Sequence, residues 1–191
     1  LEFLDNRKQW IMKHADDVYK NRKFQFPQHI HLTAINKKWH IAYERNQTRC
    51  SLSNPQPQEL VYKGNNNPQS FQRIMKNWLI KQADIAITPQ LNHLSSLLQL
   101  PYQSVQYRFQ KSRWGSCSAN ADITLNSKLL FVSTKLLRYV IIHELCHIKH
   151  FNHSKEFWDA VAQYEPCYKQ CIKALKQQDT FIPSWIVTKQ F

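Results

Sequence analysis

Glycine is scarce in this chain of 191 residues, which contains only Gly64 and Gly115. Because the two stand alone, the sequence cannot form the glycine-rich loops that cradle phosphates in P-loop or dinucleotide-binding domains. Apolar runs of the about 20 residues that span a membrane are also missing, and residues 1–5 are unlike a signal peptide. The sequence therefore predicts that the chain from Leu1 onward neither enters a membrane nor carries an export signal, and a leader lost before Leu1 stays open.

Closely spaced cysteine pairs are absent as well. The chain has five cysteines, an odd number, and none forms a CxxC pair. This pattern argues against a disulfide framework and against a zinc ribbon. Free thiols are typical of a reducing compartment, so we expect a cytoplasmic protein.

Acidic residues are few, with 13 Asp and Glu against 26 Lys and Arg, which gives a net charge of +13. Such an excess attracts nucleic acids, nucleotides or acidic substrates. Most basic residues are scattered, but residues 108–138 concentrate them against a single acidic residue, Asp122. This segment predicts a basic rim formed by Arg108, Lys111, Arg113, Lys128, Lys135 and Arg138.

Hydrophobic residues make up 42% of the chain, enough for a packed core. Periodicity predicts helices over 4–20, 71–100 with a break at Pro89, 134–150, 154–164 and 167–177. It predicts strands over 29–35, 38–44, 59–63, 105–109 and 122–132, the first two forming a hairpin around Asn36. We divide the chain into an N-terminal helix and hairpin portion, 1–66, whose start at Leu1 leaves truncation open, and a core of residues 67–191.

The clearest motif lies in the strongest predicted helix, where His143-Glu144-Leu145-Cys146-His147 has the form HExxH. Since a helix has about 3.6 residues per turn, His143 and His147 project from one face and can share a metal ion. Glu144 lies about 100° away around the helix. Its carboxylate can there take a proton from water held by the metal. The motif predicts a zinc site with Glu144 as general base.

A catalytic zinc usually has three protein ligands and one open position. His153 is the first candidate for the third ligand, because the chain can turn back after the helix. His150 shares the helical face but lies about 10.5 Å along the axis from His143, too far to join the same ion on an unbroken helix. Downstream carboxylates stay open as alternatives, namely Glu156, Asp159 and Glu165.

Further motifs flank this sequence in a fixed order. They are Lys111-Ser112-Arg113-Trp114-Gly115-Ser116-Cys117-Ser118, Ile123-Thr124-Leu125-Asn126, Asn152-His153-Ser154 and Phe157-Trp158. Together they resemble the YgjP-like metallopeptidase family, relatives of the SprT-like and WLM zincins. The histidine spacing also matches metzincins, but His150 stands where those proteins have glycine, and no methionine follows the motif.

The resemblance implies an α+β, zincin-like fold, in which a small mixed sheet packs on the HExxH helix and further helices follow. It implies Zn²⁺ held by His143, His147 and His153, with Glu144 as catalytic base and a protein or peptide substrate. It also implies that the family's usual N-terminal basic strands are missing, in line with a start at Leu1.

The loop around Gly115 allows two interpretations. It is either a tight turn, with Gly115 at positive φ and Trp114 in the core, or it lines the cleft. In the second case Arg113 stabilises an anionic substrate or intermediate. Cys117 as a nucleophile has less support, because the sequence pairs it with no base.

Three functions stay open. The leading one is a zinc-dependent hydrolase, a metallopeptidase that attacks an amide with activated water. The second keeps the metal site but acts as a nucleoside-triphosphate pyrophosphatase, an activity attached to this family that suits a basic cleft. The third is a nucleic-acid-binding module whose zinc is structural. The oligomeric state does not follow from the sequence.

Overall fold

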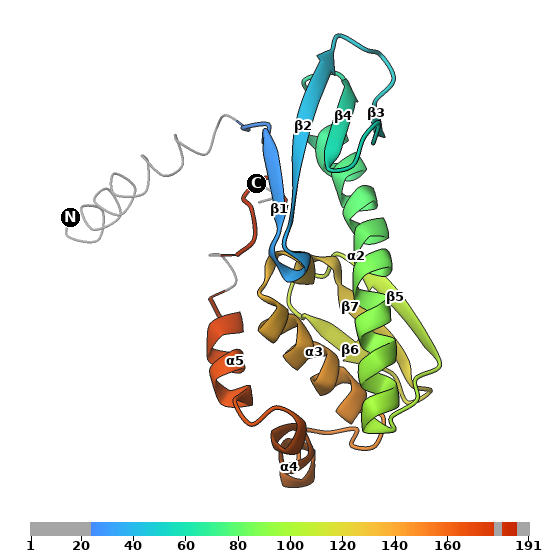
Figure 1. Cartoon of the computed structure of the whole chain (residues 1–191), viewed down its shortest axis with the longest axis vertical. Coiled ribbons are helices and arrows are strands. Elements are labelled where there is room, and N and C mark those ends of the chain that lie inside the picture. Colours follow the sequence, from blue (N-terminus) through green and yellow to red (C-terminus); the bar gives the residue numbers. More distant parts are fainter. Residues whose placement is uncertain (1–23, 178–180, 187–191) are drawn as a thin grey trace, which may run out of the picture.

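A computed structural model describes residues 24–177 and 181–186 (Figure 1). The helix predicted over 4–20 lies outside the described residues. The elements are, in order, β1 (His29–Leu32), η1 (Thr33–Ile35), β2 (Lys37–Arg45), β3 (Ser51–Ser53), β4 (Glu59–Gly64), α2 (Pro68–Leu98), β5 (Ser104–Arg108), β6 (Gly115–Cys117), β7 (Asp122–Asn126), η2 (Ser127–Phe131), α3 (Thr134–Cys146), α4 (Lys155–Tyr164) and α5 (Tyr168–Leu175). The predicted α+β class is confirmed.

The first sheet has four strands in the order β1-β2-β4-β3. The predicted hairpin is present: β1 and β2 pair antiparallel, and the 3₁₀ turn η1 joins them through Asn36, whose φ is 49°. Alternation along β2 buries Trp39 and Ile41 on one face. The sheet is mixed, because β2 and β4 run parallel while β3 and β4 run antiparallel.

The second sheet has three strands in the order β5-β7-β6. β5 and β7 run parallel, whereas β6 pairs antiparallel with β7 and forms an edge of the sheet. β6 also contacts α3. This small mixed sheet therefore brings the segment around Gly115 against the helix that carries the HExxH sequence.

The long helix α2 runs beside both sheets (Figure 1) and contacts β3 at one end and β5 at the other. The predicted break at Pro89 is wrong, because α2 continues through it to Leu98. Proline removes the hydrogen bond to the carbonyl of Ile85, but Ile85 is exposed and its carbonyl can reach water. Ile87 and Leu91, one before and one after Pro89, are buried and hold the helix against the core. Among the described helices, none is long and apolar enough to cross a membrane.

The strand predicted over 122–132 is shorter than expected, since β7 ends at Asn126 and the 3₁₀ helix η2 follows. The Asn126 side chain explains the change of structure. Its Oδ1 accepts a hydrogen bond from the Lys128 backbone N–H at 3.1 Å and so caps the new helix. Apolar residues continue past Asn126, which is why periodicity alone extended the strand.

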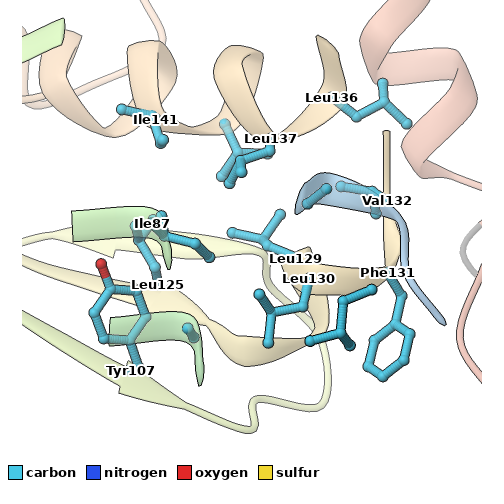
Figure 2. Close-up of a cluster of buried hydrophobic side chains, with 14 of the residues drawn as sticks. Ile87, Tyr107, Leu125, Leu129, Leu130, Phe131, Val132, Leu136, Leu137 and Ile141 are labelled. Carbon is cyan, nitrogen blue, oxygen red and sulfur yellow. The ribbon is translucent and has the colours of Figure 1, made fainter. Parts of the chain in front are cut away.

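The core beneath α3 collects side chains from distant parts of the chain. Figure 2 shows Leu137 and Ile141 of α3 with Leu129 of η2 and Ile87 of α2. All four are fully buried, and burying each side chain contributes about 1.5–3 kcal/mol. One face of α3 is thereby fixed in the core, and its position determines where the HExxH side chains lie.

Candidate metal centre

The helix that carries the HExxH sequence begins at Thr134, where the Ser133 hydroxyl accepts a hydrogen bond from the Leu136 N–H at 3.4 Å. It ends earlier than predicted, at Cys146, and His147 is its C-cap residue. His143 and His147 are still one helical turn apart, and their ring centroids are separated by 4.9 Å. The early end frees the following residues to turn.

The turn after α3 brings His153 back to the two histidines. Its Nε2 lies 3.1 Å from Nε2 of His143, and one ligand atom from each of the three residues lies within 4.8 Å of the others. Within residues 24–177 and 181–186, this is the one group of three or more potential ligands that geometry brings together. The structure thus brings His153 together with His143 and His147.

Aromatic rings support the three imidazoles. Phe157, fully buried on α4, stacks on His147 with a centroid separation of 4.5 Å. Trp158 stacks on His153 at 5.5 Å and also on Tyr168 at 5.2 Å. The motif Phe157-Trp158 therefore holds the rings in place from α4.

Hydrogen bonds orient two of the rings from behind. The Tyr139 hydroxyl lies 3.4 Å from Nδ1 of His143, and Nδ1 of His147 lies 2.9 Å from the carbonyl oxygen of His150. With Nδ1–H of His147 donating to that carbonyl, its Nε2 is left with a lone pair for a metal. Tyr139 lies four residues before His143, a spacing that could have revealed it in the sequence.

The other candidates for the third ligand are placed elsewhere. His150 contributes its backbone carbonyl rather than its ring. Asp159 pairs with Lys155 at 2.8 Å, and Glu165 pairs with Arg138 at 2.8 Å. Glu156 is exposed in the first turn of α4. Among these candidates, His153 is the residue whose ring the structure brings to His143 and His147.

The donor set fits a divalent metal. Burial, together with the charges of His147 and His153, lowers the pKa of His143 to about 3, so its imidazole is neutral and can donate a lone pair. A tetrahedral zinc with Zn–N distances of about 2.0–2.1 Å separates its nitrogen ligands by about 3.3 Å. The 3.1 Å between Nε2 of His143 and Nε2 of His153 is close to that spacing.

Glu144 lies beside the histidines and is 4% exposed. Burial raises the pKa of its carboxyl group to about 8, and the charge of Arg113 opposes this shift. Its side chain packs directly on Gly115 of β6: a Cβ atom there would lie 2.5 Å from Oε1 of Glu144. The sheet edge and α3 therefore fix the carboxylate between them.

A cavity of about 810 Å³ opens onto these groups. It is lined by His143, Glu144, His147 and His153, by residues 112–117, and by Tyr139, Val140, Phe151, Ile172, Leu175 and Lys176. Arg113 thus lies in the wall of the cavity, as the second interpretation of the loop predicts. The positive φ predicted for Gly115 is wrong, because Gly115 belongs to β6 and neither glycine has positive φ. Glycine is needed there for the close approach of Glu144.

Two further residues of this wall have structural explanations. Trp114 is half-buried and packs against the core while lining the cavity. Burial, with smaller effects of Glu144 and Asp122, raises the pKa of the Cys117 thiol to about 11. A thiol that stays protonated is a poor nucleophile, which disfavours covalent catalysis by Cys117.

The wall is anchored by Asn126, a residue to which the sequence gave no role. Asn126 is 2% exposed. Its Nδ2 donates to the carbonyl oxygens of Gln110 at 3.0 Å and Arg113 at 2.9 Å. Its backbone N–H donates to the carbonyl oxygen of Trp114 at 2.8 Å. These bonds position the segment that carries Arg113 and Gly115.

Comparison with known proteins identifies the family of this chain. The family model described as YgjP-like, metallopeptidase domain, matches residues 1–178. The chain belongs to the YgjP-like metallopeptidase family. Membership implies a hydrolase that uses a metal ion, and the three histidines are the group in the described residues that can hold it. The comparison with curated proteins found no match.

Solved structures similar to this YgjP-like chain include two metallopeptidase zymogens. Abylysin from Pyrococcus abyssi is 26% identical, with a TM-score of 0.45 over 48% of this chain and 93% of abylysin. Jannalysin from Methanocaldococcus jannaschii is 23% identical, with a TM-score of 0.43 over 48% of this chain and 95% of jannalysin.

Proposed function

We propose that this YgjP-like chain is a zinc-dependent peptidase, in which His143, His147 and His153 hold the metal and Glu144 is the general base. The observation that carries the proposal is the convergence of three imidazoles beside a buried carboxylate in one open cavity. A structural zinc site usually has four protein ligands. Three ligands facing a cavity favour catalysis over the structural role that a nucleic-acid-binding module would need.

The residues of the cavity divide the chemistry among them. Bound zinc would supply Lewis-acid chemistry, lowering the pKa of water and polarising the amide carbonyl. Glu144 lines the cavity, so its carboxylate can accept a proton from the attacking water and return it to the leaving nitrogen. Arg113 lies near enough to influence the pKa of Glu144, and its guanidinium can offset negative charge on the substrate.

Nucleotide hydrolysis is the second candidate, because two cations, Arg113 and Lys176, line the same cavity. Apolar residues of the cavity wall, among them Val140, Ile172 and Leu175, favour a peptide over a triphosphate.

We place the protein in the cytoplasm, since its five cysteines are free thiols, which a reducing compartment preserves.

The test of this function is a comparison of two substrates with the zinc-loaded protein. We expect cleavage of an unfolded protein such as casein, followed by gel electrophoresis and mass spectrometry of the fragments. Release of pyrophosphate from nucleoside triphosphates is measured on the same preparation. Pyrophosphate release without peptide cleavage would replace the peptidase proposal by the second candidate.

The ligand set is tested by a matched pair of histidine variants. His153→Ala removes a proposed ligand. Loss of a residue that only orients a ligand costs about tenfold in metal affinity, so the affinity of this variant for zinc should fall by more than that. His150→Ala keeps the backbone carbonyl that orients His147 and should bind zinc like the parent. Zinc content and affinity are measured by elemental analysis and competition with a chelator. Loss of zinc from His150→Ala alone would refute the assignment.

A further inference from the structure

A second hollow lies away from the histidine cavity, between α2 and the end of β5. It has a volume of about 490 Å³ and is lined by Gln69, Gln72, Arg73, Lys76, Asn77, Ile80, Arg108 and Phe109. These residues define the basic groove. None of them lines the cavity beside Glu144.

The charge of the basic groove has one sign. Arg73, Lys76 and Arg108 line it, and its wall contains no Asp or Glu. Lys128 lies close enough for its charge to act on Lys76: burial and Lys128 together lower the pKa of the Lys76 ammonium group. A wall lined by cations of one sign attracts polyanions.

The side chains are placed to receive such a ligand. Arg73 and Lys76 follow one another on a face of α2 at helical spacing. Nζ of Lys76 lies 5.7 Å from the centroid of the Phe109 ring, which holds the ammonium group at the groove. Nη2 of Arg108 donates to Oε1 of Gln106 at 2.7 Å, leaving its other N–H groups to bind an anion.

We infer that the basic groove binds the phosphate groups of a nucleotide polyphosphate or of a nucleic-acid strand, separately from the metal centre. Guanidinium groups match phosphate oxygens bidentately. Amides from Gln69 and Asn77 can bond sugar or base, and Ile80 adds apolar surface. The sequence predicted a basic rim over residues 108–138; the groove joins one end of that rim, Arg108, to cations of α2.

The experiment measures binding of fluorescently labelled dT12 by anisotropy, at several salt concentrations, with sodium tripolyphosphate as competitor. Arg73→Gln/Lys76→Gln/Arg108→Gln is compared with the parent. We expect the affinity of this triple variant for dT12 to fall by about tenfold or more. The slope of log K against log salt should shrink by about 2, which is the value for three lost phosphate contacts with a single strand. The double variant Arg73→Gln/Arg108→Gln changes only two exposed residues, so a loss of affinity in this variant is not explained by misfolding.

The matched control is Lys37→Gln/Lys38→Gln/Lys169→Gln, which removes the same charge from exposed positions outside the groove. Its affinity should stay within about twofold of the parent's. If tripolyphosphate competes with dT12, the groove is a polyphosphate subsite. If dT12 binding resists tripolyphosphate, the groove binds a nucleic-acid strand. Equal losses in control and groove variants, no loss in either, or equally tight binding of poly-glutamate would overturn the inference. Binding should persist in Glu144→Gln, so failure of the peptidase proposal would leave it standing.

Discussion

The Glu144→Gln variant should lose peptide cleavage while still binding zinc. Glutamine has the shape of glutamate but cannot take a proton from water, and a general base contributes about 10²–10⁴ to the rate. We therefore expect kcat to fall by about 10³. Zinc affinity should be unchanged, because the convergent ligands are the three histidines and do not include Glu144. Casein cleavage and zinc titration on the same preparation check both halves.

Stability separates this catalytic role from a structural one. Glu144 is 4% exposed, and burying an ionised carboxylate is costly. The neutral amide of glutamine avoids that cost, so the variant should unfold at the same temperature as the parent or higher. Glu156→Gln is the control, since Glu156 is exposed one helix away and should affect neither turnover nor zinc. Undiminished cleavage by Glu144→Gln would refute the general-base assignment.

The parts of the site that the sequence predicted are those that local spacing determines. His143 and His147 are one helical turn apart wherever the helix lies, so HExxH predicts their common face without any tertiary information. Likewise, alternation predicted the β1–β2 hairpin because it repeats every two residues. His153 was harder, since its placement depends on the end of α3 at Cys146, which periodicity set four residues too late.

The parts that failed depend on contacts between distant residues. β6 has three residues, too few for a pattern, and exists because β7 pairs with it. Pro89 was expected to break α2, but burial of Ile87 and Leu91 outweighs one lost hydrogen bond. The role of Asn126 could not be foreseen, because its bonds to Gln110 and Arg113 join segments more than ten residues apart. The division of the chain at residues 66 and 67 stays a prediction.

The Gly115→Ala variant should be nearly inactive although it changes no proposed catalytic or ligand residue. The added Cβ would lie 2.5 Å from Oε1, 2.7 Å from Cγ and 2.8 Å from Cδ of Glu144. Carbon atoms at rest are about 3.5–4.0 Å apart, so the carboxylate has to move by about 1 Å. A displacement of this size costs about 10²-fold in rate. Steady-state kinetics should show the loss mainly in kcat, because the histidine site keeps its zinc.

Gly64 offers the matched control for a glycine in a tight place. A Cβ at Gly64 would lie 2.7 Å from Oη of Tyr62 and 2.9 Å from Sγ of Cys50, in the first sheet and away from the histidines. Gly64→Ala should therefore lower the melting temperature without changing kcat. If both variants lose stability but neither loses turnover, Gly115 matters for packing alone.

A double variant shows whether Gly115 acts through Glu144. In the Glu144→Gln background no base is left to displace, so adding Gly115→Ala should reduce the residual turnover little further. Two independent losses would instead multiply, since the effects of uncoupled sites add in free energy. Less-than-multiplicative losses, with zinc bound in all four proteins, would show that β6 positions the carboxylate of α3. Glycine would then be required at position 115 because Glu144 occupies the space where any Cβ would lie, and not because of the backbone angle there.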